Sequence, residues 1–566
     1  MSQFHGSISL EDASLTLFSG NIELTNLSSG HVAPNLFFSF DDDNKGFCVA
    51  GTGISTDGRI TRLLTTDDWG RILEAEKIYE ISGHFAGIQF DEKKIVLFTC
   101  PFGLRDLYLL KKDNRLHFTT NYHTLFKIET PELNPEALGG RWLLYNQLDS
   151  DSLFVNYKRL SCGEKLVIDR KSLSIRSEFP YPFPALNSEI ADEPVRNFIN
   201  AINSICSLNK GTAHPIELSL SGGLDSRVLL SLLIRSKTPF SAHSFGEPDN
   251  PDVAMARQLC ERTGVKFTNY TPDELTIESA IQDVRLQARY SLLNHPATSP
   301  NNLGYYKKVV ENGSPVIIDG GFGELWRRQF FYKLSLMGGK AFFRGNRESL
   351  IPFLSHHRAD IFRAEVLNEM EKGCSKSLDR VFAENPQPET MGIDNWIDLI
   401  SLRTRLPNYY SQEQTMIDGV AIAIMPFVQK NVLDLLFSTP LELRRNSSML
   451  KRIVRNMAPE LTSLPLVKSG TTVPFSLGSL GSRVWSKVSS VTGKKISPVE
   501  DEGTKKLVLL KEFVCDLAGS GKVRNSGLLD ETKVAGILKF YDGDTSKKDE
   551  LAWLISFIAL LDIMKP

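Results

Sequence analysis

Short apolar runs separated by turn residues dominate the chain up to about residue 185. Aromatic and β-branched residues recur in these runs, and Gly, Asn, Asp and Ser gather between them, which is typical of strands. This half of the chain is therefore predicted to be rich in sheet. The runs lie at 35–40, 46–51, 88–90, 95–100, 107–110 and 115–120.

The pattern changes after the proline-dense stretch at 180–184. This stretch indicates a linker, because proline fits neither a helix interior nor a strand ladder. Beyond it, an amphipathic helix is expected at 193–207, and strand, glycine turn and helix then follow in the order of a parallel α/β sheet. The expected strands are 215–220, 240–245 and 315–318, and the expected helices are 225–234 and 251–263, with mainly helical sequence afterwards.

Length and composition favour two globular domains, which we place at 1–185 and 190–566. A chain of 566 residues exceeds the size of one core, and 41% hydrophobic with 23% charged residues is ordinary for a globular protein. The 65 basic and 67 acidic residues leave a formal charge of only -2, so no overall field favours nucleic acid or an anionic membrane. Oligomeric state is not predicted by any pattern.

Cysteine usage and the chain ends predict a cytoplasmic protein. The seven cysteines are scattered and form no C-x-x-C pair, which favours reduced thiols over a disulfide framework. The N-terminal residues show neither a basic region nor an apolar run, so no secretory signal is expected. The most apolar stretch, 551–564, is too short to cross a bilayer and contains Asp562, so it is predicted to be a buried helix.

The sharpest chemical signal is SGGLDS at 221–226, directly after an expected strand. Two glycines allow a tight turn, after which backbone N–H groups and a helix N-terminus face an anion such as a phosphate. Ser221 and Ser226 add hydroxyl donors. Asp225 would repel that phosphate unless a bridging Mg²⁺ bound both, so Asp225 is a predicted metal ligand. The alternative is a strand-to-helix turn capped by Ser or Asp without any ligand.

The hexapeptide resembles the pyrophosphatase loop of the asparagine synthetase family, which includes β-lactam synthetase and lasso-peptide cyclases. It is not a Walker loop, because no G-K-[ST] follows. The segment Ser244-Phe245-Gly246, followed by Asp252 and Ala256, is similar to the family segment that brackets adenosine, with Phe245 facing the adenine. Phe245 as a core residue at a strand end is the alternative. The resemblance implies ATP binding by Leu220, Ser221, Gly222, Gly223, Asp225, Ser226, Phe245, Gly246 and Gly320.

Segments nearer the C-terminus resemble the acceptor side of the same family, and Lys468 lies in one of them. An adenylating site must stabilise negative charge on the pyrophosphate leaving group and on the tetrahedral centre, and a fixed ammonium does so without proton transfer. The resemblance implies this catalytic role for Lys468, and Lys451, on an expected helix, is a second candidate. An ordinary solvated lysine is the alternative for both. The matching segments are Asp418-Gly419, Pro426-Phe427, Lys451 and the loop 465–470.

The loop after the third strand departs from the family pattern. The family sequence is roughly Gly-x-Gly-x-Asp-Glu, in which the Asp binds Mg²⁺ and the second position takes part in proton transfer. Aligned on Glu324, this chain has Gly323 and Gly320 at those two positions. Either Asp319 and Glu324 supply the metal and catalytic carboxylates, or the chemistry is altered. A glycine-rich turn into a helix whose N-terminal dipole Glu324 favours is the alternative.

The N-terminal half resembles the framework of the family's glutamine amidotransferase domain, at 83–86, 101–108 and 159–163. The resemblance implies an α+β Ntn-hydrolase-like sandwich here and an adenine nucleotide α-hydrolase-like α/β domain with many helices after residue 190. Such a glutaminase needs an N-terminal cysteine whose free amine serves as its base. Position 2 is Ser2, so we expect no release of ammonia from glutamine.

The resemblance implies an ATP-dependent ligase. Such an enzyme adenylates the carboxylate of a small molecule or peptide with release of pyrophosphate, and AMP leaves when ammonia or an amine attacks. One alternative is an intramolecular cyclase of the β-lactam or lasso-peptide type. Another is a nucleotide-binding homologue without catalysis, suggested by Gly320 and Gly323, and a glutaminase alone ranks last.

Overall fold

Two antiparallel sheets pack face to face in the N-terminal half, as the first half of the sequence predicts. One follows the order β12 (Tyr157–Arg159), β10 (Tyr108–Lys112), β11 (Arg115–Thr119), β1 (His5–Ser9), β2 (Leu15–Ser19) and β3 (Ile22–Glu23). The other follows β14 (Ile175–Glu178), β13 (Lys165–Asp169), β9 (Lys94–Thr99), β8 (Ser82–Phe90), β6 (Gly46–Asp57), β5 (Leu36–Phe40) and β4 (Ser29–Ala33), and β7 (Ile60–Leu63) pairs with β6. The computed structural model thus confirms a sandwich.

Alternation along β6 shows how the sandwich is filled. Cys48 and Ala50 point into the apolar core between the two sheets, whereas Phe47 and Val49 point to the opposite face. That face packs against α1 (Thr66–Glu74) and is continuous with the core of the C-terminal half. One face of one sheet therefore joins the two halves of the molecule.

The structure describes the chain except residues 1, 25–28, 34, 42–43, 58–59, 180–191, 209–214, 301, 315, 343–346, 469, 479–480, 482–484, 486–501 and 565–566. The expected linker at 180–184 and the domain boundary beside it lie outside the described residues.

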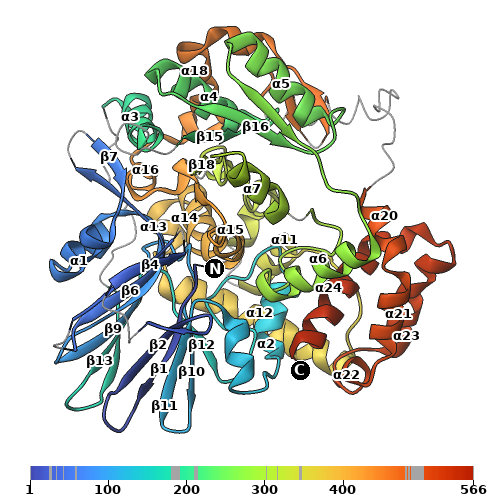
Figure 1. Cartoon of the computed structure of the whole chain (residues 1–566). Coiled ribbons are helices and arrows are strands. Elements are labelled where there is room, and N and C mark those ends of the chain that lie inside the picture. Colours follow the sequence, from blue (N-terminus) through green and yellow to red (C-terminus); the bar gives the residue numbers. More distant parts are fainter. Residues whose placement is uncertain are drawn as a thin grey trace.

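A five-stranded parallel sheet forms the centre of the C-terminal half (Figure 1). Its strands follow the order β17 (Phe267–Tyr270), β16 (Ser241–Phe245), β15 (Ile216–Ser219), β18 (Val316–Ile318) and β19 (Ile422–Ile424). The chain order reverses between β15 and β18, so the loops that follow these two strands diverge and leave a crevice at their carboxyl ends. The predicted nucleotide loop follows β15, and the predicted carboxylate loop follows β18.

Helices cover both faces of the parallel sheet. On one face lie α3 (Pro194–Cys206), α4 (Leu224–Ser236), α5 (Pro251–Thr263) and α18 (Ser448–Met457), and on the other lie α7 (Asn302–Glu311) and α15 (Ser411–Ile417). Local signals explain the bounds of α5, because Asn250 caps its first turn, Pro251 occupies N1 and Gly264 ends it with a positive φ of 70°. The expected helices at 193–207, 225–234 and 251–263 are confirmed.

The remaining helices extend the fold beyond the sheet, and Figure 1 shows the last of them, in red, at the right of the molecule. They are α2 (Pro135–Trp142), α6 (Ile277–Tyr290), α8 (Gly323–Trp326), α9 (Tyr332–Met337), α10 (Gly339–Phe342), α11 (Ile351–Leu354), α12 (Ala364–Glu384), α13 (Pro388–Met391), α14 (Ile393–Arg405), α16 (Lys430–Leu433), α17 (Leu441–Arg444), α20 (Glu502–Leu509), α21 (Lys511–Gly519), α22 (Gly521–Arg524), α23 (Glu531–Leu538) and α24 (Lys548–Met564). Twelve of the 14 residues at 551–564 in α24 are buried, as the apolar sequence of this stretch predicts. No helix among the described residues is long and apolar enough to span a membrane.

Candidate active site

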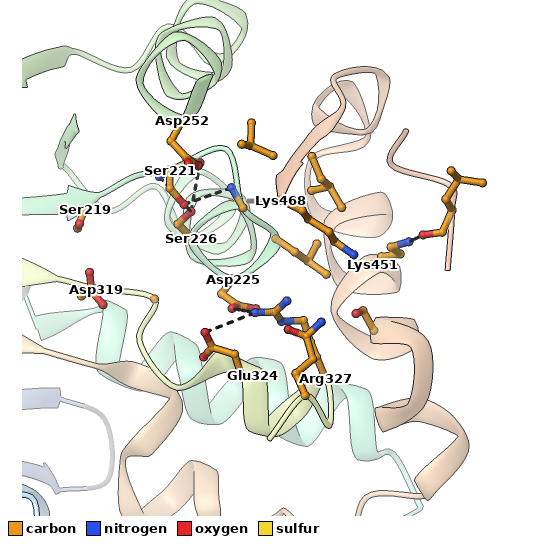
Figure 2. Close-up of a pocket in the computed structure, with 18 of the residues that line it drawn as sticks. Ser219, Ser221, Asp225, Ser226, Asp252, Asp319, Glu324, Arg327, Lys451 and Lys468 are labelled. Carbon is orange, nitrogen blue, oxygen red and sulfur yellow. Dashed lines mark hydrogen bonds and ion pairs between the residues drawn. The ribbon is translucent and has the colours of Figure 1, made fainter. Parts of the chain in front are cut away.

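A cavity of about 470 Å³ opens where β15 and β18 end (Figure 2). Its floor is formed by the loop after β15, the start of α4 and the loop after β18, and α18 with the hairpin β20 (Leu466–Lys468) and β21 (Thr471–Val473) closes the other side. Four acids and three bases line it: Asp225, Asp252, Asp319, Glu324, Arg327, Lys451 and Lys468. The cavity thus combines both charges in one enclosed space.

The glycine loop holds itself together through side chains. The Ser221 and Gly223 N–H groups donate to the hydroxyls of Ser226 and Ser221, and the Gly222 N–H donates to Asp252 Oδ1 at 2.9 Å. These amides, which we expected to face a phosphate, already have acceptors. The first turn of α4 is the stronger anion site, because no described side chain caps it and Leu224, Asp225 and Ser226 line the cavity there.

Asp225 and Arg327 form an ion pair at the floor of the cavity. Arg327 Nη2 lies 2.5 Å from Asp225 Oδ2 and 3.9 Å from Glu324 Oε1. Burial raises the pKa of Asp225 to about 6, although Arg327 opposes the shift, and the nearby Glu324 adds to it. Three buried atoms of this group have no hydrogen-bond partner, namely Asp225 Oδ1, Glu324 Oε2 and Arg327 Nε. Unsatisfied buried polar atoms are rare in proteins, and all three of these belong to residues that line the cavity.

The same oxygens suit the magnesium ion that the sequence predicts. Mg²⁺ prefers carboxylate oxygens and is commonly held by one or two of them together with substrate phosphates and water. Asp225 Oδ1 and Glu324 Oε2 can supply two such oxygens, whereas Asp319 accepts a hydrogen bond from the Gly321 N–H at 2.7 Å. Among the described residues, no three His, Cys, Asp or Glu side chains are grouped so as to hold an ion. The remaining ligands would have to come from the nucleotide and solvent.

Glycine at positions 320 and 323 has a steric reason in this chain. A Cβ atom on Gly323 would lie 2.3 Å from Asp225 Cγ, so a side chain there would occupy the place of the Asp225 carboxylate. A Cβ on Gly320 would lie 3.0 Å from the Ser226 backbone nitrogen. The two departures from the family pattern therefore let the loop after β18 approach the Asp225 loop closely, and they bring Asp319 and Glu324 to its side.

Lys451 and Lys468 lie on the side of the cavity away from Asp319 (Figure 2). Lys451 donates to the Leu477 carbonyl, and burial together with the charges of Lys468 and Arg455 lowers the pKa of Lys451 to about 8. The sequence prediction of Lys451 on a helix is confirmed by α18. The two ammonium groups therefore lie close enough to influence each other, and both lysines line the same cavity as the acids.

Arg227 fixes the Lys468 hairpin against the glycine loop, and sequence reasoning did not identify it. Its fully buried guanidinium donates to the carbonyls of Gly222, Leu461, Leu464 and Pro465. Val467 N–H also donates to the Gly222 carbonyl at 2.9 Å. The only sequence signal for this role was the position of Arg227, directly after the motif.

A family model decides what this arrangement is related to. Residues 212–465 match the model of the asparagine synthase family, and this span contains the glycine loop, the β18 loop and Lys451. The chain contains an asparagine synthase domain. The family resemblance expected from the sequence is thereby confirmed, and Lys468 lies three residues beyond the end of the match.

Two solved structures are similar at a low level. An allosteric regulatory enzyme of purine biosynthesis shares 12% identity, with 60% of this chain and 72% of that chain covered and a TM-score of 0.20. A glutamine phosphoribosylpyrophosphate amidotransferase from B. subtilis shares 11%, with 47% and 59% covered and a TM-score of 0.18. A search of curated proteins finds no match to this chain.

Some predicted ATP contacts of the asparagine synthase domain lie away from the cavity. Phe245 stacks on Tyr305, with ring centroids 4.7 Å apart, and lines a neighbouring cavity of about 200 Å³ instead. Gly246 N–H donates to Tyr270, Leu220 is buried, and Gly222 lies beneath Val467. The predicted residues that do line the main cavity are Ser221, Gly223, Asp225, Ser226, Asp319, Gly320, Glu324, Lys451 and Lys468. Ser219 and Asp319 border both cavities, so the two spaces are adjacent.

Ser2 lies at the contact between the sandwich and the asparagine synthase domain, where it is hydrogen-bonded to Asp418, the residue that follows α15. Its hydroxyl donates to the Asp418 carbonyl at 2.8 Å and accepts from the Asn35 N–H at 3.1 Å. Arg105 binds both the Ser2 carbonyl and the Asp418 carboxylate. The hydroxyl of Ser2 is therefore buried and fully bonded within a contact between domains.

Proposed function

We propose that this chain is an ATP-dependent ligase that activates a carboxylate as its acyl-adenylate, releases pyrophosphate, and forms an amide when an amine displaces AMP. The observation that carries the proposal is the cavity at the β15 and β18 switch point, which is lined both by Asp225 and Glu324, each with one unpartnered oxygen, and by Lys451 and Lys468. This cavity lies at the position where ligands bind in open parallel sheets, and its lining residues up to Lys451 belong to the asparagine synthase domain.

The residues of the cavity have separate roles in this proposal. The first turn of α4 and the hydroxyls of Ser221 and Ser226 bind phosphate oxygens, and Asp225 with Glu324 would hold Mg²⁺, which offsets the phosphate charge. Lys468 and Lys451 stabilise the negative charge that develops on the pyrophosphate. Arg227 is a positioning residue, because it holds the Lys468 hairpin on the loop.

An amine other than glutamine-derived ammonia is the proposed nucleophile. Position 2 holds serine where such a glutaminase needs cysteine, and the Ser2 hydroxyl already donates to a carbonyl and accepts from an amide. The amine and the carboxylate could belong to two molecules or to one, as in a cyclase. All seven cysteines are free thiols, which supports a reducing, cytoplasmic location.

Trapping of the acyl-adenylate tests the proposal. Purified protein is incubated with Mg-ATP, a panel of carboxylic acids and hydroxylamine, and both pyrophosphate and acyl hydroxamate are measured. We expect both products in equal amounts from at least one acid. Asp225→Ala should lower pyrophosphate release by at least a hundredfold, because the phosphate charge loses its metal ligand.

Asp273→Ala is the matched control, since this aspartate belongs to the same half of the chain but is exposed and pairs only with Lys308 among the described contacts. It should keep full activity. Equal pyrophosphate release by the Asp225→Ala and Asp273→Ala proteins would contradict the assignment of the cavity.

A nucleotide-binding homologue without catalysis is the second candidate, and the Arg327 pair on Asp225 favours it. Calorimetry decides between the two. Binding of ATP without any AMP formed across the panel supports the second candidate, whereas one AMP per hydroxamate excludes it.

A further inference from the structure

Arg327 makes fewer hydrogen bonds, among the described contacts, than Arg227 and Arg444, two other buried arginines near the cavity. Arg227 donates to four carbonyls, and Arg444 bonds Asp398, Asn395 and the Thr439 carbonyl. Among the described contacts, Arg327 hydrogen-bonds only the Asp225 carboxylate and lies 3.9 Å from Glu324 Oε1. Its Nε is buried without a partner, as is that of Arg227, so the difference lies in the outer nitrogens of the guanidinium. A guanidinium with spare donors at the wall of a cavity is suited to bind a second anion.

Asp225 is likewise only half satisfied. Its Oδ2 accepts a hydrogen bond from Arg327, whereas its Oδ1 is buried and has no partner. The residue as a whole is 9% exposed. A guanidinium 2.5 Å from one oxygen repels any cation that approaches the other. Arg327 must therefore weaken the affinity of Asp225 for a divalent cation for as long as the pair is closed.

The entry of a polyphosphate changes this balance. The phosphates offer Arg327 a second set of oxygens in the same cavity, and bidentate contact with phosphate is a strong interaction of arginine. Once Arg327 shares its charge with phosphate, the Asp225 carboxylate is available to a cation that the phosphates also bind. Each of these two ligands of opposite charge thus strengthens the binding of the other.

We infer that Arg327 acts as a guard of Asp225, by which we mean that its ion pair with the carboxylate lowers the affinity for divalent cations in the free protein. When the nucleotide binds, Arg327 transfers its hydrogen bonds to the phosphates. This inference rests on the proposed function, because it needs a nucleotide in the cavity. It adds a residue to that function which couples binding of the metal to binding of the nucleotide.

Binding of Mn²⁺ as a probe, followed by electron paramagnetic resonance, tests the guard without any turnover. The native chain should bind Mn²⁺ at least tenfold more tightly with the non-hydrolysable analogue AMPCPP than without it. Arg327→Met should bind Mn²⁺ alone at least fivefold more tightly than the native chain, since the competing charge is gone. It should also bind AMPCPP in EDTA at least tenfold more weakly by calorimetry, since a phosphate contact is lost.

Two further variants separate the guard from a general effect of charge. Lys468→Met removes a cation from the same cavity that is not bonded to Asp225 in any described contact, so it should weaken AMPCPP but change the affinity for Mn²⁺ alone less than twofold. Arg327→Lys should restore part of both effects, because lysine keeps the charge without the fork of donors.

The outcomes distinguish this inference from the proposed function. If Arg327→Met binds Mn²⁺ alone as weakly as the native chain or more weakly, the pair only positions the carboxylate and the guard is refuted. If the native chain binds Mn²⁺ but no AMPCPP, the proposed function fails as well. If AMPCPP binds and only the Mn²⁺ effect of Arg327→Met is missing, the proposed function stands and the inference alone falls.

Discussion

Asp225 and Asp418 are both buried carboxylates paired with an arginine, yet their surroundings have opposite effects. Asp418 is 0% exposed, and both of its oxygens are bonded: Oδ2 by Arg105, and Oδ1 by Gln414 and His84 at 2.9 Å. Burial alone would raise the pKa of Asp418, but His84 and Arg105 outweigh it and lower the pKa. The pKa of Asp225, by contrast, is raised to about 6.

The difference between the two carboxylates is how many of the polar atoms in each group have a hydrogen-bond partner. A buried charge is stable only when its partners satisfy it, so the Asp418 group needs nothing further and serves as a joint between domains. The Asp225 group lacks partners on three atoms and lines a cavity, so we propose that a ligand supplies the missing partners. We therefore propose that the functional site is in the C-terminal half and that the position beside Ser2 is structural.

Asp418→Asn should have the largest effect on stability. The change leaves Arg105 and His84 facing a neutral group in the domain contact, which costs about 3–5 kcal/mol of unfolding free energy. Urea unfolding followed by circular dichroism measures it. Because the folded pKa of Asp418 is lowered, its contribution is complete above the unfolded pKa of about 3.9 and is lost as pH falls through the folded value.

Glu74→Gln is the control for Asp418→Asn, since Glu74 pairs with Lys45 on the surface and should change stability by less than about 1 kcal/mol. An Asp418→Asn protein as stable as the Glu74→Gln protein would remove the contrast between the two carboxylates.

Gly323→Ala should damage the cavity while leaving the fold intact. The new Cβ would collide with the Asp225 carboxylate and push it out of its position, so nucleotide affinity should fall by at least tenfold, or about 1.4 kcal/mol. Calorimetry with AMPCPP measures the loss, and circular dichroism checks the fold. Gly536→Ala, where a Cβ meets no atom within 4 Å, should have no effect. If Gly323→Ala left the affinity for AMPCPP unchanged, nucleotide binding would not depend on the position that the Asp225 carboxylate takes beside Gly323.

Most of the fold follows from local sequence signals. The strands and helices around the glycine loop were predicted within two residues, because apolar strands, capping residues and glycines specify them locally. Many other strands were not predicted, namely β1, β2, β3, β4, β7, β12, β13, β14, β17, β19, β20 and β21. Among them, β17 and β19 have only three or four residues, and their pairing with β16 and β18 is a tertiary property without a sequence pattern.

The candidate site was predicted less completely. The motif identified Asp225 and its serines. It did not show that the side-chain oxygens of Ser226, Asp252 and Ser221 accept the hydrogen bonds of the loop N–H groups. Arg327 was missed because its partner Asp225 is 102 residues away, and only the spacing of three from Glu324 could have indicated it. Long-range pairs of this kind depend on the packing of β15 beside β18, which one sequence does not show.

The lowered pKa of Lys451 predicts that nucleotide binding depends on pH, and Asp418 and its partners should not contribute to this dependence. The pKa of Lys451 is lowered to about 8 by burial and by Lys468 and Arg455, so its positive charge is lost as pH rises through about 8. The affinity for AMPCPP should therefore decline severalfold between pH 7 and 9. Lys451→Arg keeps its charge over this range and should abolish the decline, as calorimetry at a series of pH values can show. A decline that persists in Lys451→Arg would assign the titration to another group.

Ser2→Ala should give the smallest effect and is the sharpest test of the N-terminal side of the comparison. The change removes two hydrogen bonds, from Ser2 to the Asp418 carbonyl and from the Asn35 N–H, and should cost about 1 kcal/mol in urea unfolding. Because Arg105 and His84 still satisfy the Asp418 carboxylate, amide formation should be unchanged. Glutamine hydrolysis, measured as glutamate released, should stay at the background rate in both the native chain and the variant. If the native chain hydrolysed glutamine and Ser2→Ala did not, Ser2 would be a nucleophile. A complete set of hydrogen-bond partners around a buried group would then no longer distinguish a structural contact from a catalytic site.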